Sequence, residues 1–515
     1  MTVPKRAGRA IRKGTVATAA FLWVGLVPVA PAAAAPDPGC DYNGDGKADL
    51  ALGWSSFAGG EVVVHYGSPI DLVGAEVWDL DSAGIKGTPS IISKFGAAVT
   101  CGDFDNDGFD DLAIGSAYEF SEGFVNVIYG SAAGLTEVGD QLWEQDSPGI
   151  KGVGQPNDFF GGSLATGDFN GDGYFDLAIG APGDDSVAED GGQVNVLYGS
   201  NAGLTDVADE LWDQDTLGIQ GILETGDYFG FATVGGDFDD DGFADLAIGV
   251  PYEDVAGFED AGIVQVIYGS AGGLTEVGDH LWHRDSPGIK GTNDGAGTFG
   301  FALTGADFDD DGVRDLAIGV PADSSMGQLQ SGSVNILYGL AGTGLSDVGD
   351  QLWTQDSPGI KGVAGRNDFF GISVSAGNFN GDGYRDLAIG AFLDRDINLA
   401  GSLHILYGSA AGIIDVGDQQ IAQDTDGIKG TPGIDDQWAA SLRSGDFDGD
   451  GRWDIAVGAC QDNDGGSGSY GSTTVIYGSS SGISTEDQMF VPADFFEFDD
   501  AGHGFGDVGA RKTCY

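Results

Sequence analysis

Asp168-Phe-Asn-Gly-Asp-Gly-Tyr-Phe-Asp-Leu-Ala-Ile-Gly180 decides the fold, because its pattern occurs seven times along the 515 residues. Oxygen-bearing side chains occupy its first, third, fifth and ninth positions, a glycine occupies the sixth, and a short apolar segment follows. The copies begin at residues 41, 103, 168, 237, 307, 378 and 446, so successive copies are 62 to 71 residues apart. A period of this size predicts an array of similar structural units.

The spacing of the oxygens predicts a cation site in each copy. In the second copy, the carboxylates of Asp103, Asp105 and Asp107 converge if the backbone curls, Gly108 permits the sharp turn, and Asp111 completes the shell. Hard oxygen ligands in this number suit calcium. Without a cation, carboxylates about 4 Å apart would repel one another by about 4 kcal/mol per pair at an effective dielectric constant of about 20. We therefore expect a cation in each loop.

We expect up to seven structural Ca²⁺ ions, each held by those four side chains and by the main-chain carbonyl at the seventh position. The predicted ligands are Asp41, Asn43, Asp45, Lys47, Asp49, Asp103, Asp105, Asp107, Phe109, Asp111, Asp168, Asn170, Asp172, Tyr174, Asp176, Asp237, Asp239, Asp241, Phe243, Asp245, Asp307, Asp309, Asp311, Val313, Asp315, Asn378, Asn380, Asp382, Tyr384, Asp386, Asp446, Asp448, Asp450, Arg452 and Asp454. The sixth loop, with two asparagines, should bind calcium most weakly. An EF-hand is excluded, because it needs a glutamate at the twelfth position, where the second copy has Ile114.

The first 35 residues have the pattern of a secretory signal peptide. Basic residues from Lys5 to Lys13 precede an apolar run, and a small-residue segment ends at Ala35. We expect cleavage near Ala35 and a secreted, extracellular protein of residues 36–515. A membrane anchor is the alternative, but the apolar run is short for a bilayer span. Lipidation of Cys40 is disfavoured because Asp37-Pro38 stand where an apolar residue is required.

The charge of the chain excludes several partners. Residues 1–35 hold five of the 21 basic residues and none of the 81 acidic ones, so the remainder has 16 basic against 81 acidic residues and a formal charge of −65. Nucleic acids and anionic membranes are poor partners for such a surface. Apart from the N-terminal segment, no apolar run is long enough to span a bilayer. We expect a soluble monomer without membrane insertion.

The third repeat shows the structure of one unit. Four segments read as strands: 158–166 before the loop, 177–180 directly after it, 193–199, and 210–215. Four antiparallel strands per repeat form one blade of a β-propeller. The prediction is an all-β, seven-bladed β-propeller over residues 36–515. A tryptophan recurs in the fourth strand, and we expect these residues to pack between blades, with sugar stacking as the alternative: Trp78, Trp143, Trp212, Trp282 and Trp353.

The two ends of the chain are expected to share the first blade. The first unit lacks a Phe-Gly strand before Asp41, whereas an additional one, 503–510, follows the seventh unit. The C-terminal strand should therefore complete the first blade. Four cysteines in an exported protein favour disulfides. Alignment of the units predicts a Cys40–Cys514 bond, and the sequence pairs neither Cys101 nor Cys460.

These motifs resemble the FG-GAP repeat of the propeller in integrin alpha subunits. The resemblance rests on the loops, on Gly180-Ala-Pro182, and on Phe-Gly segments at Phe95, Phe160, Phe229, Phe299, Phe370 and Phe505. It covers essentially all of residues 36–515. Two departures are Trp438-Ala439 in place of Phe-Gly and Ala459-Cys460 in place of Ala-Pro. The resemblance implies that the calcium loops lie on the lower face and that ligands bind the rim opposite them.

The longer rim segments are 182–191, 251–261, 321–331, 392–400 and 461–470. The rim carries Tyr118, Glu119, Asp184, Asp185, Tyr252, Glu253, Asp254, Phe392 and Arg395. Variable loops on a fixed scaffold are where binding residues usually occur. Ordinary solvated loops are the alternative for each of these residues.

The function expected from the sequence is an extracellular binding or adhesion module for a protein or glycan ligand. The alternative is an extracellular hydrolase or lyase that uses rim carboxylates on a glycan or phosphodiester, as in phospholipase D-like proteins with such repeats. No catalytic residue is assigned. Ser480 is the central serine of Gly478-Ser-Ser-Ser-Gly482, which matches the nucleophile-elbow motif. An elbow requires a strand-to-helix turn, and this segment is expected to be a turn between strands. His280 and His283 would point to opposite sides of a strand, which disfavours zinc.

Overall fold

The protein was analysed as a computed structural model. It describes residues 39–54, 59–69, 72–90, 92–117, 121–293, 295–324, 327–394, 400–429, 432–433, 436–459 and 471–492. The predicted signal peptide and the predicted closing strand, 503–510, lie outside these residues. Both therefore stay predictions.

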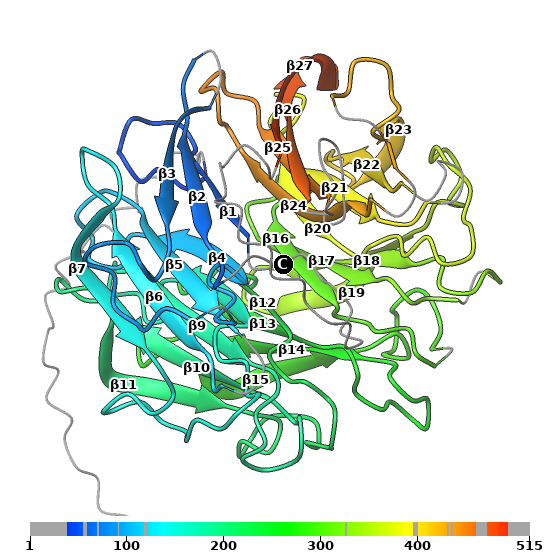
Figure 1. The fold of residues 1–515 in the computed structure, drawn as a ribbon. Coiled ribbons are helices and arrows are strands. Elements are labelled where there is room, and N and C mark those ends of the chain that lie inside the picture. The colour runs from blue at the N-terminus through cyan, green and yellow to red at the C-terminus, as the bar shows by residue number, and fades with distance from the viewer. Residues whose placement is uncertain are drawn as a thin grey trace, which may run out of the picture. The chain divides into compact units, whose positions relative to one another are not determined.

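The described residues form seven antiparallel sheets, which follow one another in chain order (Figure 1). The first three sheets contain β1 (Leu50–Gly53), β2 (Val62–Tyr66) and β3 (Val73–Trp78); β4 (Ala98–Gly102), β5 (Asp111–Ser116), β6 (Phe124–Tyr129) and β7 (Thr136–Trp143); β8 (Ser163–Gly167), β9 (Asp176–Ala181), β10 (Gln193–Tyr198) and β11 (Thr205–Trp212). The fourth and fifth contain β12 (Ala232–Gly236), β13 (Asp245–Val250), β14 (Ile263–Tyr268) and β15 (Thr275–Trp282); β16 (Ala302–Ala306), β17 (Asp315–Val320), β18 (Ser333–Leu340) and β19 (Gly344–Trp353). The last two contain β20 (Val374–Gly377), β21 (Asp386–Ala391), β22 (Ser402–Tyr407) and β23 (Ile414–Ile421); β24 (Trp438–Gly445), β25 (Asp454–Ala459), β26 (Ser472–Ser479) and β27 (Gly482–Pro492).

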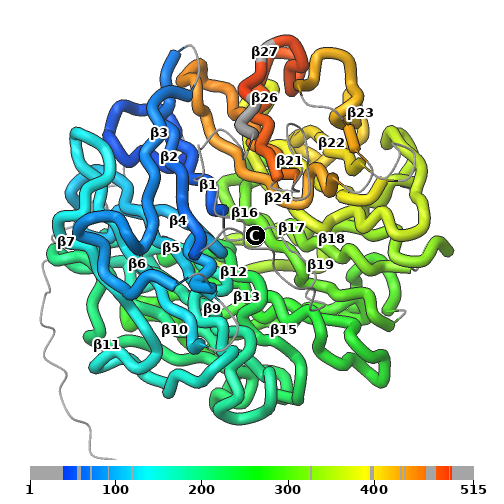
Figure 2. The backbone as a smooth tube through the Cα atoms, viewed as in Figure 1, coloured from blue at the N-terminus to red at the C-terminus, as the bar shows by residue number. Residues whose placement is uncertain are grey.

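The sheets are arranged as the blades of a seven-bladed β-propeller, which confirms the predicted fold. The first strands of neighbouring blades lie side by side from β4 through β8, β12, β16 and β20 to β24. The blue first sheet lies beside the orange and red seventh sheet, so the ring closes (Figure 2). Across this seam, the Ala48 amide donates to the Asp446 carbonyl (2.9 Å), and the Ser68 amide donates to the Phe447 carbonyl (3.1 Å). In the described ranges, no helix is long and apolar enough to cross a bilayer.

The hydrophobic core is divided among the interfaces between blades. Each of seven buried clusters draws its side chains from two neighbouring sheets, including one at the seam between the seventh sheet and the first. Between the third and fourth blades, for example, Trp212 packs in one cluster with Phe229 and Ile248. Trp78, Trp143, Trp282 and Trp353 pack against the corresponding clusters of other interfaces. The expected packing role of the recurring tryptophans is confirmed.

The Phe-Gly segments lock each blade against the one before it. Phe160 is fully buried, and its main chain forms a parallel bridge with Gly123 of the preceding blade. A Cβ atom on Gly115 would lie 2.0 Å from the Gly161 carbonyl oxygen, so this contact requires glycine. In the seventh blade, buried Trp438 and Ala439 take the place of Phe-Gly, and Ala439 has a φ of 64°. The departure from the repeat therefore keeps the same packing and the same left-handed turn.

The cysteine pairing differs from the prediction. Cys40 is bonded to Cys101 of β4, with a Cα–Cα distance of 5.8 Å, so the predicted Cys40–Cys514 bond is wrong. Cys40 directly precedes the first loop, at the position where the first strand of the other blades ends. β4 is the first strand of the next blade. The alignment of units compared strands of one sheet and overlooked this contact between neighbouring blades. Cys460 and Cys514 lie outside the described residues.

Candidate metal centres

The seven acidic loops lie where each blade passes from its first to its second strand. The second loop, Asp103 to Asp111, joins the end of β4 to the start of β5, and five further loops join the equivalent strands. The loop at residues 41–49 leads into β1. All seven loops therefore lie at the same end of their sheets, which we call the lower face. The opposite end, with the connections from second to third strand and from fourth strand to the next blade, is the rim.

The aspartate at the first position holds the loop in its curled shape. In the second loop, Asp103 Oδ1 accepts from the Asp107 amide (3.0 Å), and Asp103 Oδ2 accepts from the Gly108 amide (2.9 Å). The same pair of bonds recurs at Asp41, Asp168, Asp237, Asp307 and Asp446. In the second loop the fifth-position Asp107 Oδ1 accepts from the Phe109 amide (3.1 Å). Backbone amides thus preset the loop.

The aspartate at the ninth position ties the loop to the sheet. Asp111 Oδ2 accepts from the Phe104 amide (2.8 Å), and Asp111 Oδ1 accepts from the Gly130 amide at the end of β6 (2.9 Å). Equivalent bonds occur in all seven units, at Asp49, Asp111, Asp176, Asp245, Asp315, Asp386 and Asp454. Sequence reasoning missed this link. Its signal was the Tyr-Gly pair that ends the third strand in every unit.

The side chains of four loops are placed so that they could hold a metal ion. One oxygen each from Asp103, Asp105 and Asp111 lies within 4.8 Å of the other two. The loops at 237, 307 and 446 each hold a comparable group of three carboxylates. Two oxygens bound to one Ca²⁺ at about 2.4 Å are at most about 5 Å apart. Asp105 Oδ1 is moreover buried and receives no hydrogen bond. These donors suit a hard cation.

Without a cation, burial and the neighbouring carboxylates destabilise the ionised forms of these aspartates. Burial raises the pKa of Asp111 to about 8, two amide hydrogen bonds oppose this shift, and the charges of Asp105 and Asp103 add to it. Burial likewise raises the pKa of Asp103 and Asp105. The ninth-position Asp176, Asp245, Asp315 and Asp454 also have a pKa raised to about 8. A bound cation would favour the ionised forms.

Three loops depart from the all-aspartate pattern. Asparagine occupies the third position at Asn43, Asn170 and Asn380, so an amide oxygen takes the place of a carboxylate. In the sixth loop, Asn378 also replaces the first aspartate, and its single oxygen accepts from the Gly381 amide (2.9 Å). These substitutions reduce the negative charge offered to a cation.

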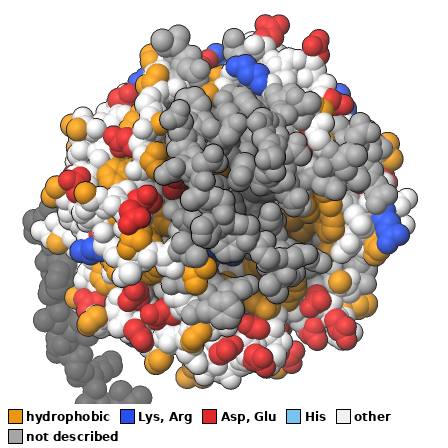
Figure 3. Space-filling view, in the orientation of Figure 1, with side chains coloured by type: hydrophobic (Ala, Val, Ile, Leu, Met, Phe, Trp, Pro, Cys, Tyr) orange, Lys and Arg blue, Asp and Glu red, His pale blue; other side chains and the backbone are white. Residues whose placement is uncertain are grey.

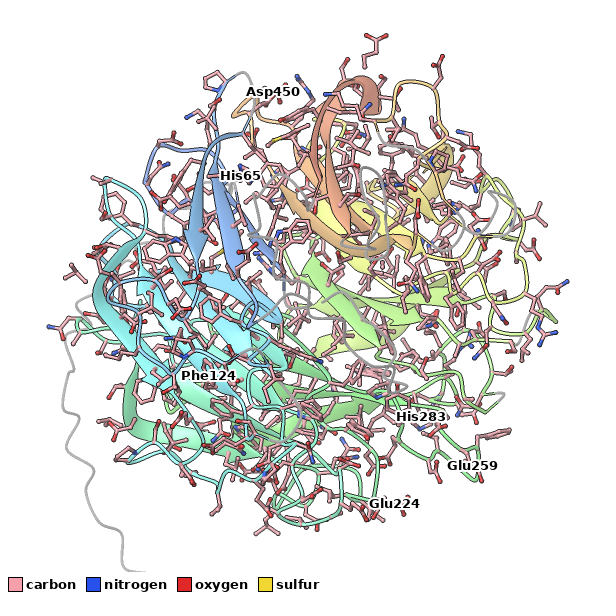
Figure 4. All side chains as sticks on the ribbon, in the orientation of Figure 1. His65, Phe124, Glu224, Glu259, His283 and Asp450 are labelled. Carbon is pink, nitrogen blue, oxygen red and sulfur yellow. A yellow bond between two sulfur atoms is a disulfide. The ribbon has the colours of Figure 1, made fainter. Side chains whose placement is uncertain are left out.

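The first and seventh loops contain their own basic residue. Lys47 Nζ lies 2.8 Å from Asp45 Oδ2, and the Arg452 guanidinium contacts Asp450, which Figure 4 labels. The fifth-position carboxylate of these loops is therefore partly neutralised. The loops beginning at 103, 237 and 307 combine four aspartates with no basic residue at the seventh position, and they offer the most negative sites.

The structure separates the predicted rim residues into two groups. Asp184 and Glu253 are buried, and they accept hydrogen bonds from Gln145 Nε2 (2.9 Å) and Gln214 Nε2 (2.8 Å) of the preceding blade. Asp185 and Asp254 are exposed, and Tyr252 and Phe392 are partly buried. Tyr118, Glu119 and Arg395 lie outside the described residues. Asp184 and Glu253 thus hold blades together, whereas the exposed residues stay candidates for binding.

The same joint is built with an ion pair in the fifth blade. Arg284 replaces the glutamine there, and its Nη1 atom lies 2.7 Å from Asp323 Oδ1, with both side chains fully buried. In the sixth blade, Gln355 Nε2 donates to Asp394 Oδ2 (3.1 Å). The interpretation of the rim acids as a uniform binding set is therefore too broad, because the acid nearest the second strand faces the neighbouring blade.

A further link between blades comes from the Gly-Ile-Lys-Gly segments. The Lys86 amide donates to Asp140 Oδ2 of the next blade (2.7 Å), and the Lys86 ammonium contacts the Asp140 carbonyl oxygen. The same bonds join Lys151 to Asp209 and Lys361 to Asp418. The recurring tetrapeptide and the recurring aspartate were visible in the sequence, but nothing in a single unit shows that they meet across an interface.

His280, His283 and Ser480 do not form the sites that were considered for them. His280 Nδ1 lies 2.9 Å from the Tyr268 hydroxyl, whereas His283 Nδ1 accepts from the Asp285 amide (3.1 Å). Among the described residues, no group of three metal-ligating side chains includes a histidine. Ser480 lies in the turn from β26 to β27, which is a strand-to-strand turn. The rejection of a nucleophile elbow is confirmed.

The fold and the loops agree with what the chain resembles among known proteins. The FG-GAP repeat model matches residues 95–130, 160–197, 229–267 and 370–405. Integrin alpha-3 of Cricetulus griseus is 32% identical over 166 residues, which are 32% of this chain and 14% of the relative. Integrin alpha-V of Gallus gallus is 31% identical over 235 residues, 44% of this chain and 20% of the relative.

A third relative is named as a phospholipase rather than as an integrin. Phosphatidylinositol-glycan-specific phospholipase D of Rattus norvegicus is 34% identical over 180 residues, which are 34% of this chain and 20% of that protein. The chain thus spans between 14% and 20% of the length of these three relatives. The matched repeats, the seven sheets and their loops together support an integrin-like FG-GAP β-propeller.

Proposed function

We propose that this protein is a secreted, calcium-stabilised β-propeller that acts as an extracellular binding or adhesion module. The observation that carries the proposal is the lower face, where carboxylates of one short segment gather within 4.8 Å of one another in four loops. Such a group needs a cation to be stable in its ionised form. Millimolar calcium is the cation that an extracellular protein with oxygen ligands meets most readily.

Calcium would be structural in this proposal. The carboxylates at the first, third, fifth and ninth positions would hold the ion, together with the main-chain carbonyl of residues such as Phe109. Bound calcium would neutralise the carboxylates and fix the turn between the first and second strands. Because the ninth-position aspartate also binds the amide at the end of the third strand, this effect would reach three strands of each blade.

Ligand binding is assigned to the rim opposite the calcium loops. The relatives named as integrins support an extracellular protein ligand, and a glycan is the other ligand class that we expect. Exposed rim residues such as Asp185 and Asp254 can offer a ligand their second carboxylate oxygen, since their Oδ1 atoms accept from the amides of Asp190 (2.7 Å) and Asp260 (3.1 Å). Red acidic side chains are spread over the visible face, and blue basic side chains are few (Figure 3). A partner with basic groups would suit this charge.

The test has two arms. In the first, the secreted protein is titrated with calcium and with magnesium while bound ions are counted by native mass spectrometry. We expect several calcium ions and a preference over magnesium; no bound calcium at millimolar concentration would refute the metal proposal. In the second arm, the calcium-loaded protein is incubated with arrays of extracellular proteins and glycans. Substitution of Asp185 and Asp254 by asparagine should weaken a captured ligand, whereas turnover of an arrayed glycan would favour an enzyme.

A further inference from the structure

The joint between the third and fourth blades contains two buried acids that face each other. Asp227 lies two residues before Phe229 of the Phe-Gly segment, and Glu253 lies on the rim segment 251–261. Asp227 is 2% exposed and Glu253 is 9% exposed. The two side chains lie close enough for a carboxyl–carboxyl hydrogen bond. A hydrogen bond between two carboxyl groups requires that one of them holds a proton.

Hydrogen-bond donors surround this pair. The neighbouring joint has Arg284 at the position where this joint has the uncharged Gln214. Gln214 Nε2 donates to Glu253 (2.8 Å), and the Glu224 amide donates to Asp227. The charged groups that bear on the pair are Glu224, on the segment that carries Asp227, and Asp254, on the segment that carries Glu253; both are acidic. Burial raises the pKa of both Asp227 and Glu253. The charges of Asp227 and Glu224 add to the shift at Glu253, whereas at Asp227 the charges of Glu224 and Asp254 add to it and the interaction with Glu253 opposes it.

The next joint, between the fourth and fifth blades, is a natural control. Gly297 stands there at the position equivalent to Asp227, so the second acid is absent. Arg284 stands at the position equivalent to Gln214 and pairs with Asp323 at 2.7 Å. The joint that lacks the second acid thus has a guanidinium in place of the glutamine amide. The two joints therefore differ in charge, because the first combines two acids with an amide and the second combines one acid with a permanent cation.

Glu253 also holds the base of its rim segment. The Gly262 amide donates to the Glu253 carbonyl (3.0 Å), and the Glu253 amide donates to the Val250 carbonyl (3.4 Å). Tyr252, the adjoining residue, contacts the rings of Tyr228 and Phe231 edge-on, at centroid distances of 5.4 and 5.9 Å. Glu224 and Glu259, from the two segments that border the joint, lie toward the periphery of the ring (Figure 4). A change at Glu253 would therefore reach the whole 251–261 segment.

We propose that the Asp227–Glu253 pair is a proton-operated lock that fastens rim segment 251–261 to the blade in mildly acidic solution and loosens it as pH rises. With one proton, the two carboxyl groups attract each other through an O–H···O bond. When that proton leaves for solvent, two carboxylates face each other in a buried place and repel. A group whose pKa is raised in the closed state stabilises that state at low pH and loses the effect as pH rises through the raised value. The closing equilibrium should fall up to about tenfold for each pH unit over which the closed joint holds one additional proton.

Hydrogen exchange measured by mass spectrometry tests the lock in the full secreted chain with saturating calcium. Exchange of segment 251–261 is compared at about pH 5.5 and about pH 8.5, after correction for the intrinsic rate, with residues 321–324 and 327–331 of the fifth blade as the control. We expect protection of 251–261 to fall by at least about tenfold at the higher pH and the control to stay within about twofold. An equal response in both segments would overturn the proposal.

Two variants separate the proton from other effects. Glu253→Gln keeps an acceptor for Gln214 and gains a donor for Asp227, so the segment should stay protected at both pH values. Asp227→Asn offers the same donor from the other side and serves if the first variant folds poorly. A pH response that survives in the folded variants would refute the lock. Any effect of pH on ligand capture rests on the proposed function of the rim; the exchange result does not, so the two can fail separately.

Discussion

The lower face and the rim both gather carboxylates, but they neutralise them by different means. In the loop at Asp103, three carboxylates of one nine-residue segment converge, and Asp105 Oδ1 is buried without a hydrogen bond. At the rim, Asp184, Glu253, Asp323 and Asp394 each take an amide or a guanidinium from the neighbouring blade. In the proposed function, the lower face takes a cation from solution, whereas the rim joints are completed by protein groups or, in the proposed lock, by a proton.

Chelation of calcium should produce the largest effect on stability, because it empties several sites of the lower face together. It leaves the rim joints unchanged. At calcium a hundredfold above its dissociation constant, each site adds about 2.7 kcal/mol, so four sites together add on the order of 10 kcal/mol. We expect a fall in Tm of about 10 °C or more when calcium is removed with a chelator. Differential scanning calorimetry of verified metal-free protein measures this. An unchanged Tm would remove the distinction between the two faces.

Removal of the Arg284 guanidinium should be the most costly single change at the rim. Arg284→Met takes the cation away from buried Asp323, and we expect a loss of about 3–5 kcal/mol. Arg284→Gln restores the amide that Gln145, Gln214 and Gln355 use elsewhere, so it should cost less than half as much. Denaturant unfolding in saturating calcium compares the two variants. If both lose the same stability, the amide and the guanidinium are not equivalent solutions.

The stabilisation by calcium should grow with pH. In the metal-free protein, burial raises the pKa of Asp111, Asp245 and Asp315 to about 8, so their protonated forms favour the fold below that pH and the benefit is lost as pH rises through it. Calcium requires the ionised forms, so its affinity should rise over the same range, by about 1.4 kcal/mol per pH unit for each proton released. The difference in Tm between calcium-loaded and metal-free protein should therefore be larger at about pH 8 than at about pH 6. A difference independent of pH would contradict this.

The smallest effect should distinguish loops within the lower face. Asn378→Asp restores a first-position carboxylate that accepts two amides elsewhere, and the affinity of the sixth loop should rise roughly tenfold. Asp307→Asn is the matched change in the fifth loop and should weaken that site by a similar factor. Stepwise calcium titration followed by native mass spectrometry shows which sites fill last. If the unmodified sixth loop fills before the all-aspartate loops, charge does not set the order.

Features that repeat within one unit could be predicted from the sequence. The loops, the four strands and the Phe-Gly segments recur in phase, so the chain acts as its own alignment and predicts seven blades. The curled shape of the loops follows because their oxygens and the amides that bind them lie within five residues. The metal itself stays a prediction.

Contacts between units could not be predicted in the same way. Gln214 and Glu253 are 39 residues apart, and Cys40 and Cys101 are 61 residues apart, on different blades. Their meeting depends on how neighbouring sheets are stacked, which no pattern inside one repeat encodes. The Cys40–Cys514 prediction failed for this reason. The sequence does contain a signal for the joints, because Gln145, Gln214, Arg284 and Gln355 follow the tryptophan of their strand by two residues.

The Cys40–Cys101 bond has a mechanical consequence. Tension applied at the N-terminal end of the described chain reaches Cys40 and passes through the covalent bond directly into β4. The residues between the two cysteines, which include the whole described first sheet, then carry none of that load. If force acts on the protein while it binds a partner, as the proposed function implies, this bond would protect the first sheet, where the ring closes, from unfolding.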